Sequence, residues 1–331
     1  MGRTIRPTAL LIGLAAVAGS ALLLGQTPQL RAKVSTELPH YAAAVAVKGT
    51  LEIAGTDALL DLGEEWGQAF RRYQPDARLA YAPKLSKEAA RDLIDGTRSL
   101  IIIARDLTQD ELKAFQAKYG YAPMRIPICL DATIVIVHKN NPISAISMEQ
   151  LDAVYSKERR GGAPTAAVLW GDLGVRGGLG KRPITAYARA EGAATRDAFQ
   201  NTVLLKGEYR AGIQPRDDSG ALAEAVTTDE TGLAIGSLAS WYAAVKVLPI
   251  IPYKGTEPRF PSPENVTTGK YPMPRLYCAY VNRAPGQPLE PLLNEALHFL
   301  ISQEGQGVAA DTGILPAPPE FLSIAQKRLD R

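Results

Sequence analysis

The stretch ARAEGAATRDAF, residues 188–199, joins an apolar segment with a strand pattern to one with a helix pattern. Arg189, Gly192 and Thr195 would bring a cation, free backbone N–H groups and a hydroxyl to the start of that helix. A carboxylate at Glu191 would hold the guanidinium of Arg189 in place. Together these groups suit an oxyanion. An ordinary helix start, with Arg189 on the surface, is the alternative that the loop alone leaves open.

Motifs of known catalytic sites are missing from the sequence. It contains no G-x-S-x-G elbow, no H-E-x-x-H helix and no phosphate-binding P-loop, and its three histidines are scattered. Neither histidines nor cysteines have the spacing of a zinc site. We therefore expect a protein that is not an enzyme and that uses no cofactor or metal.

Composition and charge limit the class of protein further. The 331 residues are 46% hydrophobic and 21% charged, which is typical of a globular protein and long enough for two domains. The formal net charge is +3, and the chain has no long blocks of like charge. Nucleic acid is therefore not an expected partner.

The N-terminus has the pattern of an export signal. Arg3 and Arg6 precede an uncharged run over residues 7–25, and a polar segment follows. The run is also close to the minimum length of a membrane span, so an uncleaved anchor is the alternative. We expect residues 1–32 to form the signal or anchor, and the protein to lie in the periplasm, either free or held at the inner membrane.

Cys129 and Cys278 are the two cysteines, and each lies in an apolar, strand-like stretch. In an exported protein they could form a disulfide, whereas buried free thiols are the alternative. The sequence leaves both open.

Strand and helix patterns alternate along the rest of the chain, which predicts an α/β protein with mainly parallel sheets covered by helices. The apolar run over residues 124–139 is too long for an ordinary strand and predicts a crossing between two domains. Ser86 is expected to cap the second helix. Other expected strands span 50–55, 77–82, 99–104, 184–189, 232–237 and 276–282. Expected helices span 59–73, 86–96, 108–120, 147–156, 193–205, 219–228, 238–245 and 292–300.

From about residue 48 to residue 317 the sequence resembles the substrate-binding proteins of phosphate ABC transporters. Five segments match in the family's order: GTDALLDLGEEWGQAF, LSKEAARDLIDGTRSLIIIARDLTQDEL, IPICLDATIVIVHKNNPISAISMEQLDAVYS, ENVTTGKYPMPRLYCAYVN and FLISQEGQGVAADTGILP. The resemblance implies a two-domain periplasmic-binding-protein-like fold that closes on phosphate. It also implies a monomer with an ABC transporter permease as its partner.

The domain boundaries follow from this alternation and resemblance. Domain I is expected to comprise residues 48–136 and 252–318, and domain II residues 137–251, with the ligand in the cleft between them. Residues 319–331 are expected to form a peripheral C-terminal extension.

The resemblance also implies roles for individual residues. Arg189 matches the family's ligand arginine, and Glu191 stands where an aspartate supports it. Gly192 and Thr195 match the anion loop. Two further hydroxyls match ligand positions, namely Thr56 in the opening turn and Ser86 at the start of a helix.

Several positions depart from the family's pattern. Ala193 and Ala194 replace Ser-Gly, which removes one hydroxyl and adds strain if that glycine needs a positive φ. Asp57 places a negative charge where the family has a hydroxyl or a small group. Ser99 stands at the family's phosphate-selecting aspartate, and Ala104 replaces a serine before Arg105.

These departures leave two functions open. The first is a periplasmic binding protein that captures phosphate or another small oxyanion for an ABC transporter. The second is the same fold turned to a different solute or to a protein partner, without catalysis.

Overall fold

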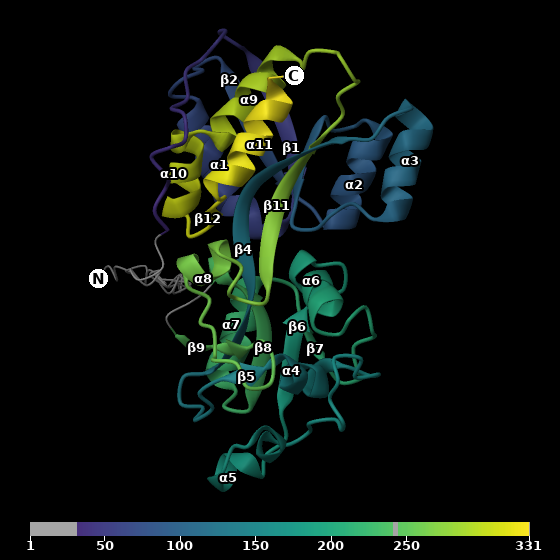
Figure 1. Ribbon diagram of the computed structural model, residues 1–331, viewed down its shortest axis with the longest axis vertical. Helices are drawn as coiled ribbons and strands as arrows, with labels where there is room; N and C mark the ends of the chain where they lie inside the picture. The colour runs from purple at the N-terminus through teal and green to yellow at the C-terminus, as the bar shows by residue number, and fades with distance from the viewer. Residues whose placement is uncertain (1–31, 241–243, 331) are drawn as a thin grey trace, which may run out of the picture.

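A long strand, β4 (Met124–His138), runs through both halves of the molecule, as the sequence predicted. The computed structural model describes residues 32–240 and 244–330, and Figure 1 shows two lobes joined by β4 and β11 (Pro274–Val281). Each lobe is a mixed sheet flanked by helices, which confirms the predicted α/β, two-domain fold class.

Domain I, the upper lobe in Figure 1, has the strand order β2-β1-β3-β11-β4. β1 is parallel to β2 and β3, whereas β11 is antiparallel to both of its neighbours. Its strands are β1 (Gly49–Gly55), β2 (Ala77–Pro83), β3 (Leu100–Ile103) and β12 (Leu315–Pro316). Its helices are η2 (Asp57–Leu59), α1 (Leu60–Phe70), α2 (Ser86–Asp95), α3 (Gln109–Tyr119), α9 (Pro291–Ile301), α10 (Gln303–Asp311) and α11 (Pro319–Leu329).

Domain II, the lower lobe, continues the sheet as β4-β8-β6-β7, with β9 also paired to β4. β6 is parallel to β7 and β8. Its strands are β5 (Ile146–Ser147), β6 (Thr185–Arg189), β7 (Gln214–Arg216), β8 (Gly232–Ser237), β9 (Val245–Leu248) and β10 (Ile250–Ile251). Its helices are α4 (Met148–Tyr155), η3 (Trp170–Leu173), α5 (Gly177–Gly180), α6 (Ala194–Thr202), α7 (Ser219–Thr228), η4 (Leu238–Ser240) and α8 (Pro263–Thr267).

Local capping chemistry sets several helix boundaries. The Thr108 hydroxyl accepts from the N–H of Glu111 at the start of α3, whose carboxylate in turn accepts from the N–H of Thr108. Gly96, with φ of 78°, ends α2 in the left-handed region that glycine favours. The predicted cap at Ser86 is wrong, because Leu85 is the N-cap of α2 and Ser86 is its first helical residue.

The hydrogen bonds of β4 place the hinge between Ala132 and Thr133. Residues up to Ala132 pair with β11 of domain I, and residues from Thr133 onward pair with β8 of domain II. After β10, the side chains of Val266, Tyr271 and Met273 are buried in the core of domain II. The predicted boundaries therefore move, with domain II extending from about residue 133 to about residue 273.

The C-terminal helix α11 belongs to the domain I core. Leu322, Ala325 and Leu329 are buried there, against the cluster that contains α9. The prediction of a peripheral extension is wrong, because the three apolar residues lie on one helical face that the sheet covers.

The two cysteines are buried free thiols on neighbouring strands. Cys129 packs into the core cluster on one face of the domain I sheet, and Cys278 packs into the cluster on the other face. The alternative of a disulfide is therefore wrong, since the thiols point to opposite sides of the sheet.

Two predictions fall partly outside the described residues. The expected signal or anchor at residues 1–32 lies outside the described residues except for residue 32, where the description begins. The helix expected at 238–245 is a 3-10 turn over Leu238–Ser240, and β9 already begins at Val245. Within residues 32–240 and 244–330, no helix has the length and apolar character needed to cross a membrane.

Candidate functional site

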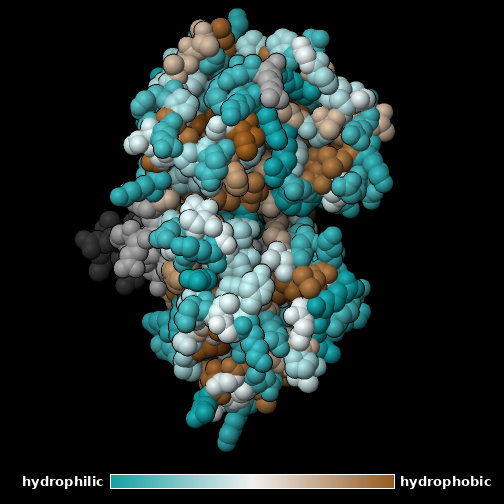
Figure 2. Space-filling view, viewed as in Figure 1, coloured by the Kyte–Doolittle hydropathy of each residue, from teal (hydrophilic) through white to brown (hydrophobic). Residues whose placement is uncertain are grey.

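The carboxyl ends of parallel strands from both domains meet at the boundary between the lobes. Thr56 follows β1 and α2 follows β2 in domain I, while Arg189 ends β6 and α6 follows it in domain II. Open α/β sheets bind ligands outside these strand ends. Figure 1 has α2 above and α6 below this boundary, which Figure 2 shows as a waist between the lobes.

Arg189 is the central cation of this region. It is 4% exposed, and its Nη2 donates to Asp57 Oδ2 at 2.5 Å and to the carbonyl of Asp217 at 2.6 Å. Its Nη1 lies 3.4 Å from Ser219 Oγ, and its Nε has no partner in the part of the chain that the structure describes. Because Asp57 is in domain I, the ion pair joins the two lobes.

Asp57 and Ser219 also line a groove of about 330 Å³ between the domains. One wall comes from η2 and α1 of domain I, and the other comes from the start of α7 of domain II. The side chain of Asp57 is 43% exposed. An anion that enters the groove would therefore meet the carboxylate that holds Arg189.

Two buried hydroxyls come from domain I. Thr56 is 2% exposed, and its Oγ1 accepts from the N–H of Ala58 at 3.2 Å. Ser86 is 1% exposed, and its Oγ has no partner among the described residues. A buried polar group left unpaired costs about 1–3 kcal/mol. The Ser86 hydroxyl is therefore a group that a ligand oxygen would stabilise.

The turn before α6 brings the anion loop close to α2. Gly192 has φ of 84°, and a Cβ there would lie 3.2 Å from the Leu85 side chain. Ala193 is the N-cap of α6 with φ of −70°, and its side chain makes no capping hydrogen bond. Because Ala193 and helical Ala194 have negative φ, the strain considered for alanine at these positions does not arise.

Thr195 and Glu191 have different surroundings from those expected. Thr195 is 4% exposed, and its Oγ1 accepts from Arg275 Nη1 at 2.8 Å. Glu191 is exposed. The support for Arg189 that the sequence predicted from Glu191 is supplied by Asp57 instead.

Ser99 lies at the opposite edge of the domain I sheet. It precedes β3, whereas the candidate site lies beyond the end of that strand, where the N–H of Thr56 donates to the carbonyl of Ile102. The four residues of β3 span about 13 Å at roughly 3.3 Å per residue. The prediction that Ser99 occupies the ligand-selecting position is therefore wrong.

Arg105 does reach the correct edge, but its guanidinium is already paired. Its two Nη atoms donate to the Glu111 carboxylate at 2.7 and 2.8 Å. Burial alone would lower the pKa of Arg105, but the hydrogen bond and charge of Glu111 raise it. Across the domain boundary, burial raises the pKa of Asp197, although the charge of Arg105 opposes this.

Sequence reasoning missed Asp131 and Arg275. They lie opposite each other on β4 and β11, are 1% and 3% exposed, and form an ion pair. The signal was present, because each is a charged residue within an otherwise apolar strand pattern. Buried charges of this kind are found where they are paired or functional.

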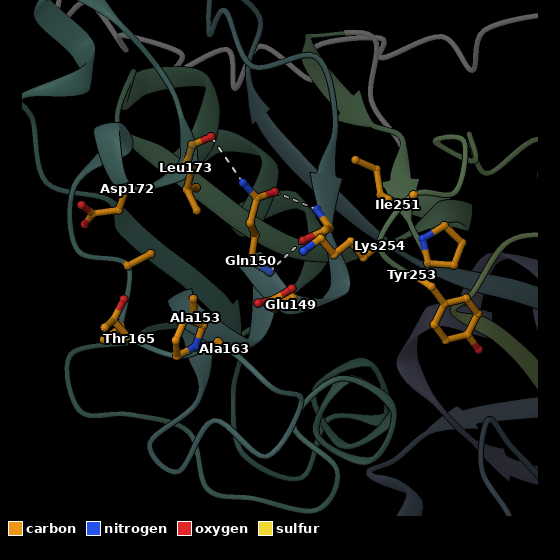
Figure 3. Close-up of a pocket in the computed structure, with 16 residues that line it drawn as sticks. Glu149, Gln150, Ala153, Ala163, Thr165, Asp172, Leu173, Ile251, Tyr253 and Lys254 are labelled. Carbon is orange, nitrogen blue, oxygen red and sulfur yellow. Dashed lines mark hydrogen bonds between the residues drawn. The ribbon is translucent and has the colours of Figure 1, made fainter.

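Another cavity, of about 510 Å³, lies within domain II beside α4. Figure 3 shows Glu149, Asp172 and Lys254 around it, with Gln150 hydrogen-bonded to the carbonyl of Leu173. This cavity lies within one domain, away from the strand ends that meet between the lobes. Over the described residues, no group of three or more His, Cys, Asp or Glu side chains is placed to hold a metal ion.

The fold and the cleft together define a two-domain solute-binding protein. A family model for the PBP superfamily domain matches residues 42–304, so the chain belongs to the PBP superfamily. A relative named phosphate-binding protein PstS, from Pseudomonas aeruginosa, is 32% identical over 298 residues, which cover 90% of this chain and 92% of that protein.

Solved structures share the fold. A putative phosphate ABC transporter substrate-binding protein with bound phosphate, from Clostridium perfringens, has a TM-score of 0.66 at 23% identity, with 82% of this chain and 100% of that chain covered. An ABC-type phosphate transport receptor from Vibrio cholerae has a TM-score of 0.64 at 16% identity, with 80% and 99% covered.

Proposed function

We propose that this protein captures phosphate or a related small oxyanion in the cleft between its domains and delivers it to an ABC transporter. The observation that carries the proposal is the buried guanidinium of Arg189, which a carboxylate of the opposite domain already contacts at 2.5 Å. A buried guanidinium that already pairs with a carboxylate oxygen can also donate to the oxygens of a phosphate.

The other donors are arranged around this cation by the strand ends. Ser86 offers an unpaired hydroxyl, and Thr56 offers a second hydroxyl in the opening turn. The first turn of α6 begins at Ala193 without a side-chain cap, which leaves N–H groups for an anion. Gly192 and Thr195 complete the loop from domain II. Arg189 and these groups are the ligand residues of the proposal.

Asp57 gives the site its selectivity in this proposal. The Asp57 carboxylate holds Arg189, so a ligand oxygen without a proton would meet a negative charge with no hydrogen bond to offset the repulsion. A ligand must either displace the carboxylate from Arg189 or bring a proton that the carboxylate accepts. An oxyanion that carries a proton, such as hydrogen phosphate, is therefore preferred to sulfate.

The relatives support the class of ligand and the setting. The Pseudomonas relative is named a phosphate-binding protein, and a matching structure is described as a high affinity periplasmic phosphate-binding protein. By this likeness we propose a periplasmic, monomeric, non-catalytic protein with an ABC transporter permease as its partner. The N-terminal segment then acts as an export signal or as a membrane anchor.

A second candidate is the same fold adapted to a different solute or to a protein partner. It is favoured by Ala193, Ala194 and Ala104, which provide no hydroxyl at the edge of the cleft. Loss of one hydrogen bond to a charged ligand weakens binding by about 1.5–3 kcal/mol. The backbone donors of α6 remain, and we therefore place oxyanion capture first.

Calorimetric and thermal-shift titrations of the purified protein with phosphate, arsenate and sulfate test the proposal. A ligand at about 1,000 times its Kd stabilises the folded protein by about 4 kcal/mol. We expect a clear shift with phosphate and arsenate and a smaller one with sulfate. The absence of any shift with all three anions at low salt would overturn oxyanion capture and favour the second candidate.

A further inference from the structure

One buried ion pair lies where the chain crosses between the domains. Asp131 of β4 and Arg275 of β11 face each other in the strand register, one residue before the hinge at Ala132 and Thr133. Both side chains are almost fully buried. A charged pair in this position is costly to desolvate, so its hydrogen bonds indicate what it does.

The Asp131 carboxylate is saturated by donors from both domains. Its Oδ1 accepts from the N–H of Ala239 at 3.1 Å, and its Oδ2 accepts from Ser237 Oγ at 2.5 Å and from the Tyr277 hydroxyl at 3.1 Å. Arg275 Nη2 also donates to Oδ2. These bonds fix the position of the Arg275 guanidinium against β8, η4 and β11.

The other end of the guanidinium reaches the candidate anion site. Arg275 Nη1 donates to Thr195 Oγ1 at 2.8 Å, in the first turn of α6. The charge of Asp57 also acts on Arg275, which brings the pair into the electrostatic range of the Arg189 contact. The hinge and the anion loop are therefore joined through a single side-chain contact.

The direction of that hydrogen bond determines what Thr195 can do. A guanidinium has only donors, so the Thr195 oxygen must accept, and its own proton is left to donate elsewhere. Among the described residues, this proton has no acceptor. A hydroxyl whose oxygen is held by a cation is also a stronger donor, because hydrogen bonds in a chain polarise one another.

We propose that Arg275 is a positioning residue for ligand capture, which turns the Thr195 hydroxyl proton into the cleft as a donor to the bound oxyanion. Asp131 keeps the guanidinium in place and balances its charge. Since both strands cross between the domains at this pair, ligand bonding at Thr195 acts directly on the hinge. This inference rests on the proposed function of the cleft.

A double-mutant cycle on phosphate affinity tests it. We expect Thr195→Val to weaken phosphate binding by about 10- to 100-fold, which is the loss of one hydrogen bond to a charged ligand. Arg275→Lys keeps the charge but is expected to lose the bond to Thr195, and it should weaken binding by about 10-fold. In the background of Thr195→Val, the same Arg275 substitution should change the Kd by less than about 2-fold.

Controls separate positioning from stability. Thr195→Ser keeps the hydroxyl and should retain the affinity of the original protein to within a few-fold. Ser302→Ala removes the N-cap of α10 in domain I, where Ser302 Oγ accepts from the N–H of Gly305 at 3.2 Å. Because Ser302 bonds to none of Asp131, Arg275 and Thr195, the substitution should lower Tm while leaving the phosphate Kd unchanged. If Arg275→Lys does not fold, the Arg275→Gln and Asp131→Asn double variant replaces the ion pair with neutral amides and serves the same cycle.

The outcomes distinguish this inference from the proposed function. Additive losses in the cycle, or an unchanged Kd in Arg275→Lys, would overturn the positioning role while phosphate capture stands. If the unsubstituted protein binds none of phosphate, arsenate and sulfate, the proposed function and this inference both fall.

Discussion

Two helices, α2 and α6, begin at the cleft from opposite domains, and their first turns are built differently. At the start of α2, the N–H of Leu85 donates to the Glu88 carboxylate at 3.2 Å, so the helix supplies its own anion. At the start of α6, Ala193 provides no side-chain cap. A helix N-terminus without a cap keeps unsatisfied N–H groups and a partial positive charge.

The difference shows how binding and stability are divided between the domains. In domain I, the Glu88 carboxylate satisfies the N–H of Leu85 at the start of α2, and the buried hydroxyl of Ser86 has no partner among the described residues. Domain II leaves the α6 terminus open next to the buried cation Arg189. The unsatisfied N–H groups of this terminus lower the stability of the free protein. A bound oxyanion would accept from them and so raise that stability.

The largest effect is expected where the open terminus meets the cation. Arg189→Ala should reduce oxyanion affinity by more than about 100-fold, because a charge-assisted, bidentate contact is lost. Calorimetry with phosphate measures this. Arg182→Ala is the matched control, since Arg182 is a half-exposed arginine of the same domain paired with Glu230. Phosphate binding that survives in Arg189→Ala would place the ligand elsewhere.

A cap added to α6 would remove the contrast with α2. Ala193→Asp should stabilise the free protein by about 1 kcal/mol as an N-cap. It should also weaken phosphate binding by about 100-fold, because its carboxylate takes the place of the ligand. Ala193→Asn caps without the charge, so it should match the gain in Tm with a much smaller loss of affinity. Equal affinities in the two variants would contradict an anion site at this terminus.

The Asp57 carboxylate, which links the domains, is expected to control selectivity between anions. Asp57→Asn should strengthen sulfate binding by about 2 kcal/mol, or roughly 30-fold, because a negative charge near the ligand is removed. Phosphate should change less, since its proton already satisfies the carboxylate. Competition titrations measure this ratio of affinities. Asp76→Asn is the control, because Asp76 is exposed and precedes β2, at the end of that strand away from the cleft. An unchanged ratio of sulfate to phosphate affinity would remove Asp57 from the site.

The smallest expected effect concerns Ser86. Ser86→Ala should weaken phosphate binding by about 10-fold while leaving the free protein as stable or slightly more stable, because an unpaired buried hydroxyl is removed. In contrast, Ser147→Ala removes the N-cap of α4. In the unsubstituted protein, Ser147 Oγ accepts from the N–H of Gln150 at 3.0 Å. The substitution should cost about 1 kcal/mol of stability without altering affinity. Parallel losses of Tm in both variants would indicate that Ser86 is structural.

Local signals in the sequence were sufficient for much of the fold. The capping boxes at Thr108 and Ser147 each form between residues three apart in the sequence, and the long apolar run became the crossing strand β4. These features depend on neighbours within a few residues along the chain. The placement of Arg189 at the end of a strand and of Thr195 in the first helical turn was readable for the same reason.

Errors arose where position depended on strand register or on partners distant in sequence. Ser99 and Arg105 flank the same short strand, and only the pairing of β3 with β1 shows which end faces the cleft. The helical face of α11 gave no indication of the sheet that covers it. Cys129 and Cys278 are close in the sheet, yet alternation of side chains directs them to opposite faces.

The sequence by itself determined the α/β alternation, the crossing strand and the glycine turn before α6, because these follow from periodicity, capping and local residue type. Only the tertiary structure decided that Asp57 rather than Glu191 holds Arg189, and that Arg275 holds the Thr195 hydroxyl. The physical reason is that both contacts join segments far apart in the chain, 132 and 80 residues respectively. Their geometry is set by how two sheets meet at the hinge.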